Sequence, residues 1–181
     1  WRTSPYHFAN DFVQMLVASS TDGGKTWEYE TLIDLDTDVR EPRFLELGGK
    51  LQLLFFQAGI DLIQFEPKKI WRTKRNKLGK WTDIEVLIDQ PEVPWDIKVR
   101  NGRGWMSSYL GNHYDITVES TVEVYFKVTD DGDTWSKVDD VPYVYKGGVS
   151  ETAFEFDTDG SLWVVTRNED GDDSGFGSHV C

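Results

Sequence analysis

The chain has 181 residues, of which 14% are aromatic and eight are Trp, and this length is enough for one domain with a sizeable core. Its formal net charge of −13 argues against a nucleic-acid or anionic-membrane surface, because both need clustered Lys and Arg. No apolar run approaches the roughly 18 residues of a membrane-spanning helix, and no signal-like leader is visible. We therefore expect neither nucleic acid nor membrane as a partner.

Cysteine usage leaves the cellular compartment open. Cys181 is the only cysteine, so an intrachain disulfide is excluded, and the sequence has no Asn-x-Ser/Thr sequon. A secreted or periplasmic location is compatible with these features but is not required by them. The sequence opens on Trp1 rather than Met, so we expect a trimmed, processed or incomplete chain.

The local pattern along the chain is that of strands. Helical periodicity is hard to find, whereas short runs of alternating, β-branched and aromatic residues recur, and Gly, Asp and Asn turns separate them. Examples are LQLLFFQ (51–57), GWMSSYL (104–110), TVEVYFKVT (121–129) and SLWVVTR (161–167). This pattern predicts an all-β chain built from hairpins.

One turn motif recurs with a fixed period. STDGGKTW (20–27), KRNKLGKW (74–81) and VTDDGDTW (128–135) place Trp27, Trp81 and Trp135 at intervals of 54 residues. Asp22, Asn76 and Asp130 keep the same interval. The three segments are thus copies of one turn, with the middle copy the most degenerate.

Glycine turns alternate with this motif. ELGGKL (46–51), VRNGRGW (99–105) and DTDGSLW (157–163) each join two apolar runs. Each repeat therefore holds about four strands, which is the sequence description of a propeller blade. A β-sandwich would also have many short strands, but it would not keep a strict 54-residue period.

We expect a single partial β-propeller domain over residues 1–181, with about 3.4 four-stranded blades of roughly 54 residues each. A partial first blade covers 1–36, the second 37–90, the third 91–145 and a partial fourth 146–181. Because an open propeller leaves strand edges unpaired, we expect a missing segment or self-association to complete a ring of six blades.

The repeated turn has a structural explanation for each conserved position. The carboxylate of Asp22 can accept hydrogen bonds from backbone amides of its own turn, and glycine permits the positive φ of a tight reversal. Trp27 is expected to begin the next strand and to pack against the blade. Asn76 can replace the aspartate because the turn needs an acceptor and not a charge.

The motif resembles the Asp box, the bacterial neuraminidase repeat of sialidases. The first copy matches fully, the second keeps mainly Asn76 and Trp81, and the third has Val128 where the leading Ser or Thr is expected. This resemblance implies a propeller. It says little about function, because Asp boxes also occur in propellers that are not enzymes.

The resemblance also suggests site residues at the channel mouth. A turn centred on Asp159 places Glu151 opposite Arg167, as an ordinary ion pair or as part of a polar site. In sialidases a Glu in this place assists a Tyr nucleophile, and an Arg on the following strand belongs to a three-arginine cluster that binds the substrate carboxylate. The resemblance thus implies these roles for Glu151 and Arg167, while the family's Tyr nucleophile and later arginine would lie beyond this chain.

Two assignments compete for the first arginine of that cluster. Arg40, in VREPRF, matches the family's Arg-Ile-Pro motif in part, and Asp61 would then be the acid/base residue. Counting blades back from Glu151 makes Arg2 and Asp11 the rivals. The simpler interpretation of Arg40 is a solvated residue at a strand entry. Tyr143 and Tyr145 precede Glu151 and are interpreted as strand residues.

The third repeat offers candidate sugar-binding residues at its mouth, and we single out Trp95, Asp96 and Tyr109. Ser108 and His113 are close in sequence, and packing between blades is the alternative explanation for all of them. His113 and Asp115 are too isolated for a catalytic triad. We predict no cofactor and no metal site, and we interpret the acidic segment 168–173 as a solvated loop.

Two functions are compatible with these features. The first is a sialidase-related glycoside hydrolase that acts on sialic acid or another acidic glycan, with Glu151 and Arg167 in the roles above. The second is a non-catalytic propeller that binds a glycan or a protein.

Overall fold

The computed structural model describes residues 1–7, 10–63, 65–111, 122–138, 144–171, 173 and 175–180. These residues form strands, turns and loops, so the all-β prediction is confirmed. No helix among them is long and apolar enough to cross a membrane. The candidates His113, Asp115 and Tyr143 lie outside the described residues.

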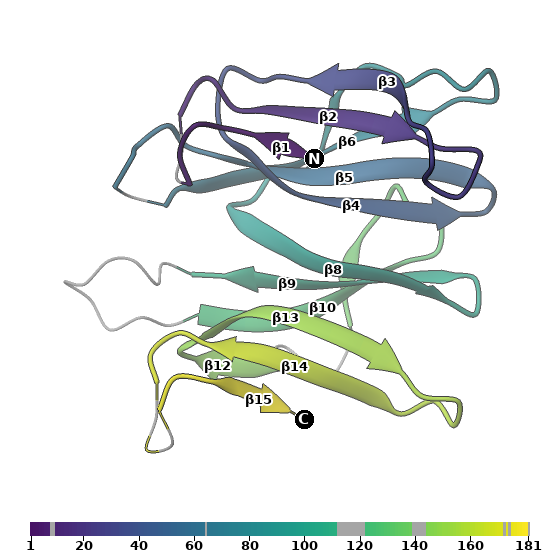
Figure 1. Ribbon diagram of the computed structural model, residues 1–181. Coiled ribbons are helices and arrows are strands. Elements are labelled where there is room, and N and C mark those ends of the chain that lie inside the picture. The colour runs from purple at the N-terminus through teal and green to yellow at the C-terminus, as the bar shows by residue number, and fades with distance from the viewer. Residues whose placement is uncertain are drawn as a thin grey trace. The chain divides into compact units, whose positions relative to one another are not determined.

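The described strands form four antiparallel sheets that follow one another along the chain (Figure 1). The first contains β1 (Arg2–Thr3), β2 (Gln14–Ser19) and β3 (Glu28–Ile33), and the second β4 (Val39–Leu47), β5 (Lys50–Ala58), β6 (Pro67–Arg75) and β7 (Glu85–Ile88). The third contains β8 (Glu92–Arg100), β9 (Arg103–Leu110), β10 (Val122–Thr129) and β11 (Ser136–Lys137), with β12 (Tyr145–Gly147) also paired to β10. The fourth contains β13 (Val149–Phe156), β14 (Leu162–Asn168) and β15 (Ser178–Val180). Apart from β12, the strands of each sheet pair in sequence order, as the repeat predicts.

The glycine turns set the register of each inner hairpin. Asn101 and Gly102 have φ values of 53° and 76°, the left-handed pair that a two-residue hairpin turn requires and that Asn-Gly adopts readily. In the fourth sheet Thr152 pairs with Thr166 and Phe156 with Leu162. The predicted centre of that hairpin is therefore confirmed.

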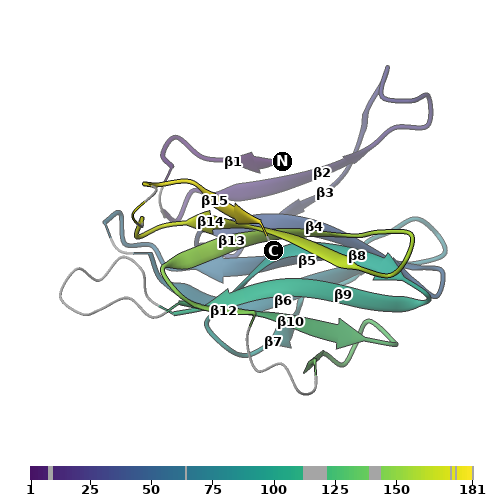
Figure 2. The same ribbon diagram turned by 90° about the horizontal axis from the view of Figure 1, so that it is seen from below.

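The first Asp turn has the predicted hydrogen bonds. Oδ1 of Asp22 accepts the amides of Lys25 and Thr26 at 2.9 Å each, and Oδ2 accepts the Thr26 hydroxyl at 2.7 Å. These bonds, with the Thr26 amide the main cause, hold the pKa of Asp22 far below its usual range. Trp27 does not pack as expected. The turn projects past the ends of β2 and β3 (Figure 2), and Trp27 is 64% exposed.

The third Asp turn differs from its predicted alignment. Asp131, and not Asp130, accepts the turn amides of Asp133 and Thr134, at 2.7 and 2.8 Å. Thr129 takes the place of the leading Ser or Thr, and its hydroxyl accepts the amide of Gly132 at 2.9 Å. This copy has one residue fewer between the aspartate and the Trp, so alignment by the Trp alone gave the wrong aspartate.

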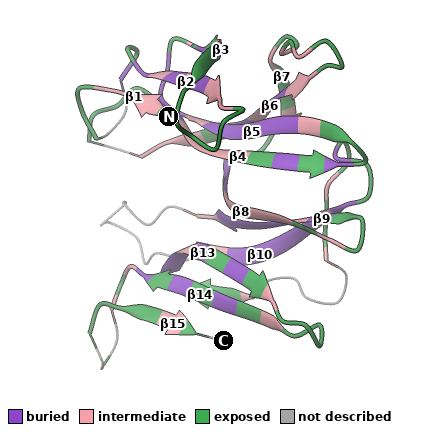
Figure 3. Ribbon diagram, turned by 45° about the vertical axis from the view of Figure 1, so that its right-hand side comes forward, coloured by how far each residue is buried: buried purple, intermediate pink, exposed green. Residues whose placement is uncertain are grey.

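The chain forms two compact units, which we describe separately. The first unit comprises Trp1–Phe44 with Lys50–Pro91, and the second comprises Leu45–Gly49 with Glu92–Cys181. The core of the first unit contains Val13, Met15, Val17, Ile33, Val39, Leu53 and Phe55, and a core cluster of the second contains Phe126, Phe154 and Val164. Buried positions are dense on the middle strands β5, β9 and β10 (Figure 3).

A polar contact also links the two sheets of the first unit. Arg75 on β6 donates two hydrogen bonds of 2.9 Å to the carboxylate of Glu30 on β3. The indole Nε1 of Trp81 donates to the same carboxylate at 2.6 Å. The hydrogen bonds from Arg75 are the main reason why the pKa of Glu30 lies below its usual range.

Candidate functional site

The candidate site lies at the end of the first unit opposite its Asp turns. Here β2, β4 and β6 begin, and the loops 4–13 and 59–66 connect strands. We call this the entry end of the first unit. Loops that join rigid strands are the usual location of binding residues in β folds.

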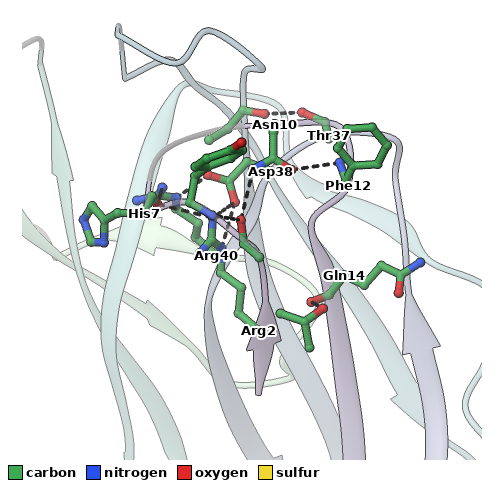
Figure 4. A network of polar contacts seen from close by, with 12 residues as sticks. Arg2, His7, Asn10, Phe12, Gln14, Thr37, Asp38 and Arg40 are labelled. Atoms are coloured by element: carbon green, nitrogen blue, oxygen red, sulfur yellow. Dashed lines mark hydrogen bonds and ion pairs between the residues drawn. The ribbon is translucent and has the colours of Figure 1, made fainter.

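Two arginines at the entry end share one carboxylate (Figure 4). Nε of Arg2 lies 2.9 Å from Oδ1 of Asp38, and Nε of Arg40 lies 2.5 Å from Oδ2. The backbone carbonyl of His7 accepts a further hydrogen bond from each guanidinium. Arg2 and Arg40, the two alternatives for the first arginine of the predicted cluster, are therefore held side by side.

Backbone contacts fix Asp38 at this position. Its carbonyl accepts the amide of Ala58 at 2.8 Å, and the hydroxyl of neighbouring Thr37 donates to the Ala58 carbonyl. Asp38 and Arg40 are two residues apart at the start of β4, so their side chains leave the strand on the same face. The local geometry thus directs Arg40 onto its partner.

The burial of these groups limits their roles. The Asp38 side chain is fully buried, whereas the side chains of Arg2 and Arg40 are 23% and 11% exposed. The two arginine side chains are therefore partly accessible to a ligand, whereas the carboxylate of Asp38 is not. Asp38 is a positioning residue, and the cluster of two arginines and one aspartate keeps one net positive charge.

The backbone beside Arg40 has an unusual conformation. Glu41 has a φ of 48° although it precedes Pro42, and a residue before proline favours extended backbone. Non-glycine residues with positive φ are often found where surrounding structure holds strain for function. The backbone that follows Arg40 thus departs from regular β geometry.

The other candidates of the entry end lie on its loops. Asp61 is exposed on the loop 59–66, where its Oδ1 accepts the amide of Ile63 at 2.8 Å. Phe65 on the same loop lies beneath Arg40, with the guanidinium carbon 5.7 Å from the ring centroid. Asp11 is exposed on the loop 4–13. Phe65 is therefore one contact between Arg40 and the loop that carries Asp61.

In the second unit the predicted pair of Glu151 and Arg167 is in contact. Nη1 of Arg167 lies 2.9 Å from Oε1 of Glu151, and Nη2 lies 3.4 Å from Oε2 of Glu169. The Arg167 side chain is 51% exposed, and that of Glu151 is 29% exposed. Arg167 is accessible to a ligand but already lies between two carboxylates.

The candidates of the third sheet have structural partners. The carboxylate of Asp96 accepts the amides of Ile97 at 2.9 Å and Phe154 at 3.2 Å, which connects β8 to β13. A shift of register between Pro94 and Asp96 places a β-bulge at Trp95. Tyr109 is only 5% exposed. These contacts are those expected from packing between blades, and a sugar-binding role for the three residues stays a prediction.

A buried charged cluster in the second unit escaped the sequence analysis. Glu92, fully buried at the start of β8, accepts a hydrogen bond from Lys127 Nζ at 2.5 Å and another from the Tyr125 hydroxyl. Burial, followed by the charge of Glu92, raises the pKa of Tyr125 above its usual range. Tyr125 is 1% exposed, so it belongs to the core and is out of reach of a substrate.

Asp38 and Glu92 were missed for the same reason. Each lies just before or at the first residue of a strand, and it has at least one partner on a different strand: Arg2 for Asp38, and Tyr125 and Lys127 for Glu92. The sequence did offer one signal for Asp38: an acidic residue two positions before Arg40 in a predicted strand lies on the same face as the arginine. Among the described residues, no group of three His, Cys, Asp or Glu side chains is placed to hold a metal ion.

Comparison with solved structures gives the fold. The chain resembles the alpha-L-arabinanase of Penicillium chrysogenum complexed with arabinobiose, with 15% identity and a TM-score of 0.57 over 85% of this chain and 48% of the arabinanase. It resembles the endo-arabinase of Bacteroides thetaiotaomicron, with 11% identity and a TM-score of 0.51 over 93% of this chain and 69% of that protein. The alpha-L-arabinofuranosidase of Lactobacillus brevis matches with 18% identity and a TM-score of 0.51 over 85% and 55%.

The chain has a β-propeller fold. The prediction of a partial propeller is thus confirmed, and the neighbours are five-bladed propeller glycosidases whose names concern arabinose-containing glycans. The expected ring of six blades stays a prediction. None of the three is named as a sialidase, so the sialidase assignment remains a proposal. The propeller chain spans about half the length of the arabinanase. No family model and no curated protein matches the sequence.

Proposed function

We propose that the chain is part of a glycoside-hydrolase-type propeller that binds a carboxylate-bearing glycan at the entry end of its first unit. The observation that carries this proposal is the pair formed by Arg2 and Arg40, which converge on Asp38. Within this group of three side chains, the formal charges of two guanidinium groups and one buried carboxylate sum to one positive charge. Arginine is the side chain best suited to a planar carboxylate, because its N–H groups match both oxygens.

The fold and the loops support a sugar ligand. The neighbours of similar fold are glycosidases, and one of them was solved with arabinobiose. Tyr6 and Phe12 on the loop 4–13 are 61% and 74% exposed, so aromatic surface is available close to the arginines in the chain. An aromatic ring beside a charged group suits a sugar that has one apolar face and one carboxylate.

A binding assay on the whole chain tests this proposal. Titration with 3′-sialyllactose, trigalacturonic acid and neutral lactose should show saturable binding of at least one acidic sugar and none of lactose at the entry end. Arg40→Lys keeps the charge but loses the planar fork, and we expect binding about 10-fold weaker. Arg43→Lys, on the same strand and paired with Glu41 at 3.6 Å, is the matched control and should bind as wild type. Equal weakening of lactose and acidic-sugar binding by Arg40→Lys would overturn the proposal, because it would show that the entry end does not distinguish a carboxylated sugar from a neutral one.

The catalytic form of the proposal involves Glu151 and Arg167. We propose sialidase-type chemistry in which Glu151 assists a Tyr nucleophile and Arg167 contacts the substrate carboxylate. Hydrolysis of a fluorogenic sialoside by the full-length protein, lost on Arg167→Ala, would support it. Lys146→Ala, which removes a surface ion pair with Glu123 in the same unit, is the control.

The alternative is a propeller that binds glycans without cleaving them. The ion pairs of Arg167 with Glu151 and Glu169 favour it, because they give the arginine a structural role. Glycan binding without turnover of sialosides or arabinosides by the full-length protein would decide for this alternative.

A further inference from the structure

We propose that a groove beside two hairpin turns of the second unit, 101–102 and 157–161, is a separate binding site for a neutral saccharide. The groove has a volume of about 640 Å³ and is lined by Arg100, Asn101, Arg103, Trp105, Phe156, Asp159, Gly160 and Leu162. These residues come from the two inner hairpin turns, 101–102 and 157–161, and from the strand ends next to them. This volume is in the range of small-ligand sites. The proposal does not depend on the function proposed for the entry end.

Two aromatic lining residues, Trp105 and Phe156, contact each other, and we call them the floor of the groove. Trp105 and Phe156 meet edge to face, with ring centroids 5.2 Å apart at an interplanar angle of 72°. Both rings pack against the core cluster of Phe126, Phe154 and Val164. An aromatic surface held in one orientation can stack against the C–H face of a sugar ring at little cost in side-chain entropy.

The polar lining residues are Arg100, Asn101, Arg103 and Asp159, which we call the rim, and nearby carboxylates offset its positive charges. Arg103 donates to both oxygens of Asp130, at 2.7 and 3.0 Å. Arg100 stacks over the Phe156 ring at 4.9 Å and donates to the Asp157 carbonyl at 2.8 Å. The carboxylates of Asp130 and Asp159 offset the two arginines, so the rim does not select an anion.

This combination identifies the chemical class of the ligand. A planar guanidinium, an amide and a carboxylate around an aromatic floor provide donors and acceptors for vicinal hydroxyl groups. A carboxylated sugar would meet the negative charge of Asp159, and an apolar ligand would leave the polar rim without partners. A neutral pentose or hexose unit satisfies both the floor and the rim.

Binding can be located in the whole chain through its Trp side chains. We would titrate the isotope-labelled protein with arabinotriose, xylotriose, cellotriose and galactotriose, and follow the Trp105 indole N–H and the amides of Asn101 and Gly160. At least one neutral trisaccharide should shift all three signals with one saturation curve. Arg40→Lys at the entry end should leave this titration unchanged, which separates the two proposals.

Two variants test the rim, and a third is their control. Arg100→Ala removes one donor group and should weaken binding about 10-fold. Asn101→Gly keeps the left-handed turn while it removes the amide, so a loss with this variant does not arise from misfolding. Lys50 follows the glycine turn of the second sheet as Arg103 follows that of the third. Lys50→Ala is therefore the control variant, and it should bind as wild type. Absence of a shift with all four trisaccharides, wild-type affinity of both rim variants, or shifts with trigalacturonic acid alone would overturn the proposal.

Discussion

Arg2 and Arg40 donate hydrogen bonds to opposite oxygens of one fully buried carboxylate, that of Asp38. A buried aspartate between two arginines is costly to desolvate unless both partners stay in place. Removing its charge would leave two guanidinium groups facing each other with one compensating group fewer. Asp38 therefore orients the two arginines, and its negative charge offsets the repulsion between their positive charges.

We expect Asp38→Asn to lower the free energy of unfolding by about 3 kcal/mol, because breaking a buried ion pair leaves uncompensated charge. Urea unfolding of the variant and the wild type measures the change. Asp34→Asn is the control, since Asp34 is exposed and accepts hydrogen bonds from the Gln14 side chain and the Asp36 amide but has no buried arginine partner in the part of the chain that the structure describes. A loss no larger than that of the control would mean that Asp38 does not hold the arginines.

Much of the fold was predictable because its signals are local. Turn residues such as Asn101 and Gly102 specify the hairpin, and alternation of apolar residues specifies which strand face is buried. The 54-residue period then indicates that the hairpins repeat as blades. These features need no knowledge of contacts between distant segments.

The site was only partly predictable because its contacts are not local. Glu151 and Arg167 belong to one hairpin, so counting from the turn located their ion pair. Asp38 contacts Arg2 through a loop whose path no local pattern specifies. The misplaced Asp130 has a different cause, since one missing residue in a turn shifts the alignment without changing the period.

Substitutions of Asp22 in the first Asp turn test whether the turn needs only a hydrogen-bond acceptor or also a negative charge. We expect Asp22→Ala to lower Tm by about 2–4 °C, because several turn amides lose their acceptor. Asp22→Asn should retain most of the stability, since Asn76 accepts the amides of Leu78 and Lys80 in the second copy at 2.9 and 3.0 Å. Differential scanning calorimetry compares the two variants, and an equal loss in both would show that the charge itself is needed.

The third Asp turn tests the corrected alignment. Asp131→Ala should lower Tm by about 2–4 °C, because the amides of Asp133 and Thr134 lose their acceptor. Asp130→Ala removes only an exposed ion pair with Arg103 and should change Tm by less than about 1 °C. The reverse order of the two effects would restore the alignment by the Trp residues.

The contact of Glu30 with Arg75 makes stability depend on pH in one direction. Hydrogen bonds from Arg75 lower the pKa of Glu30 in the folded protein from its usual 4.5. A carboxyl with a lowered folded pKa contributes its full stability above its unfolded pKa, and this contribution is lost as the pH falls through the folded pKa. Glu30→Gln should therefore lower the free energy of unfolding by about 2 kcal/mol at pH 7, and by less as the pH falls from about 5 to 3.

Urea unfolding at several pH values measures the difference, with the exposed Glu28→Gln on the same strand as the control. A difference between Glu30→Gln and wild type that stays constant down to pH 3 would show that the carboxylate charge contributes nothing to this contact.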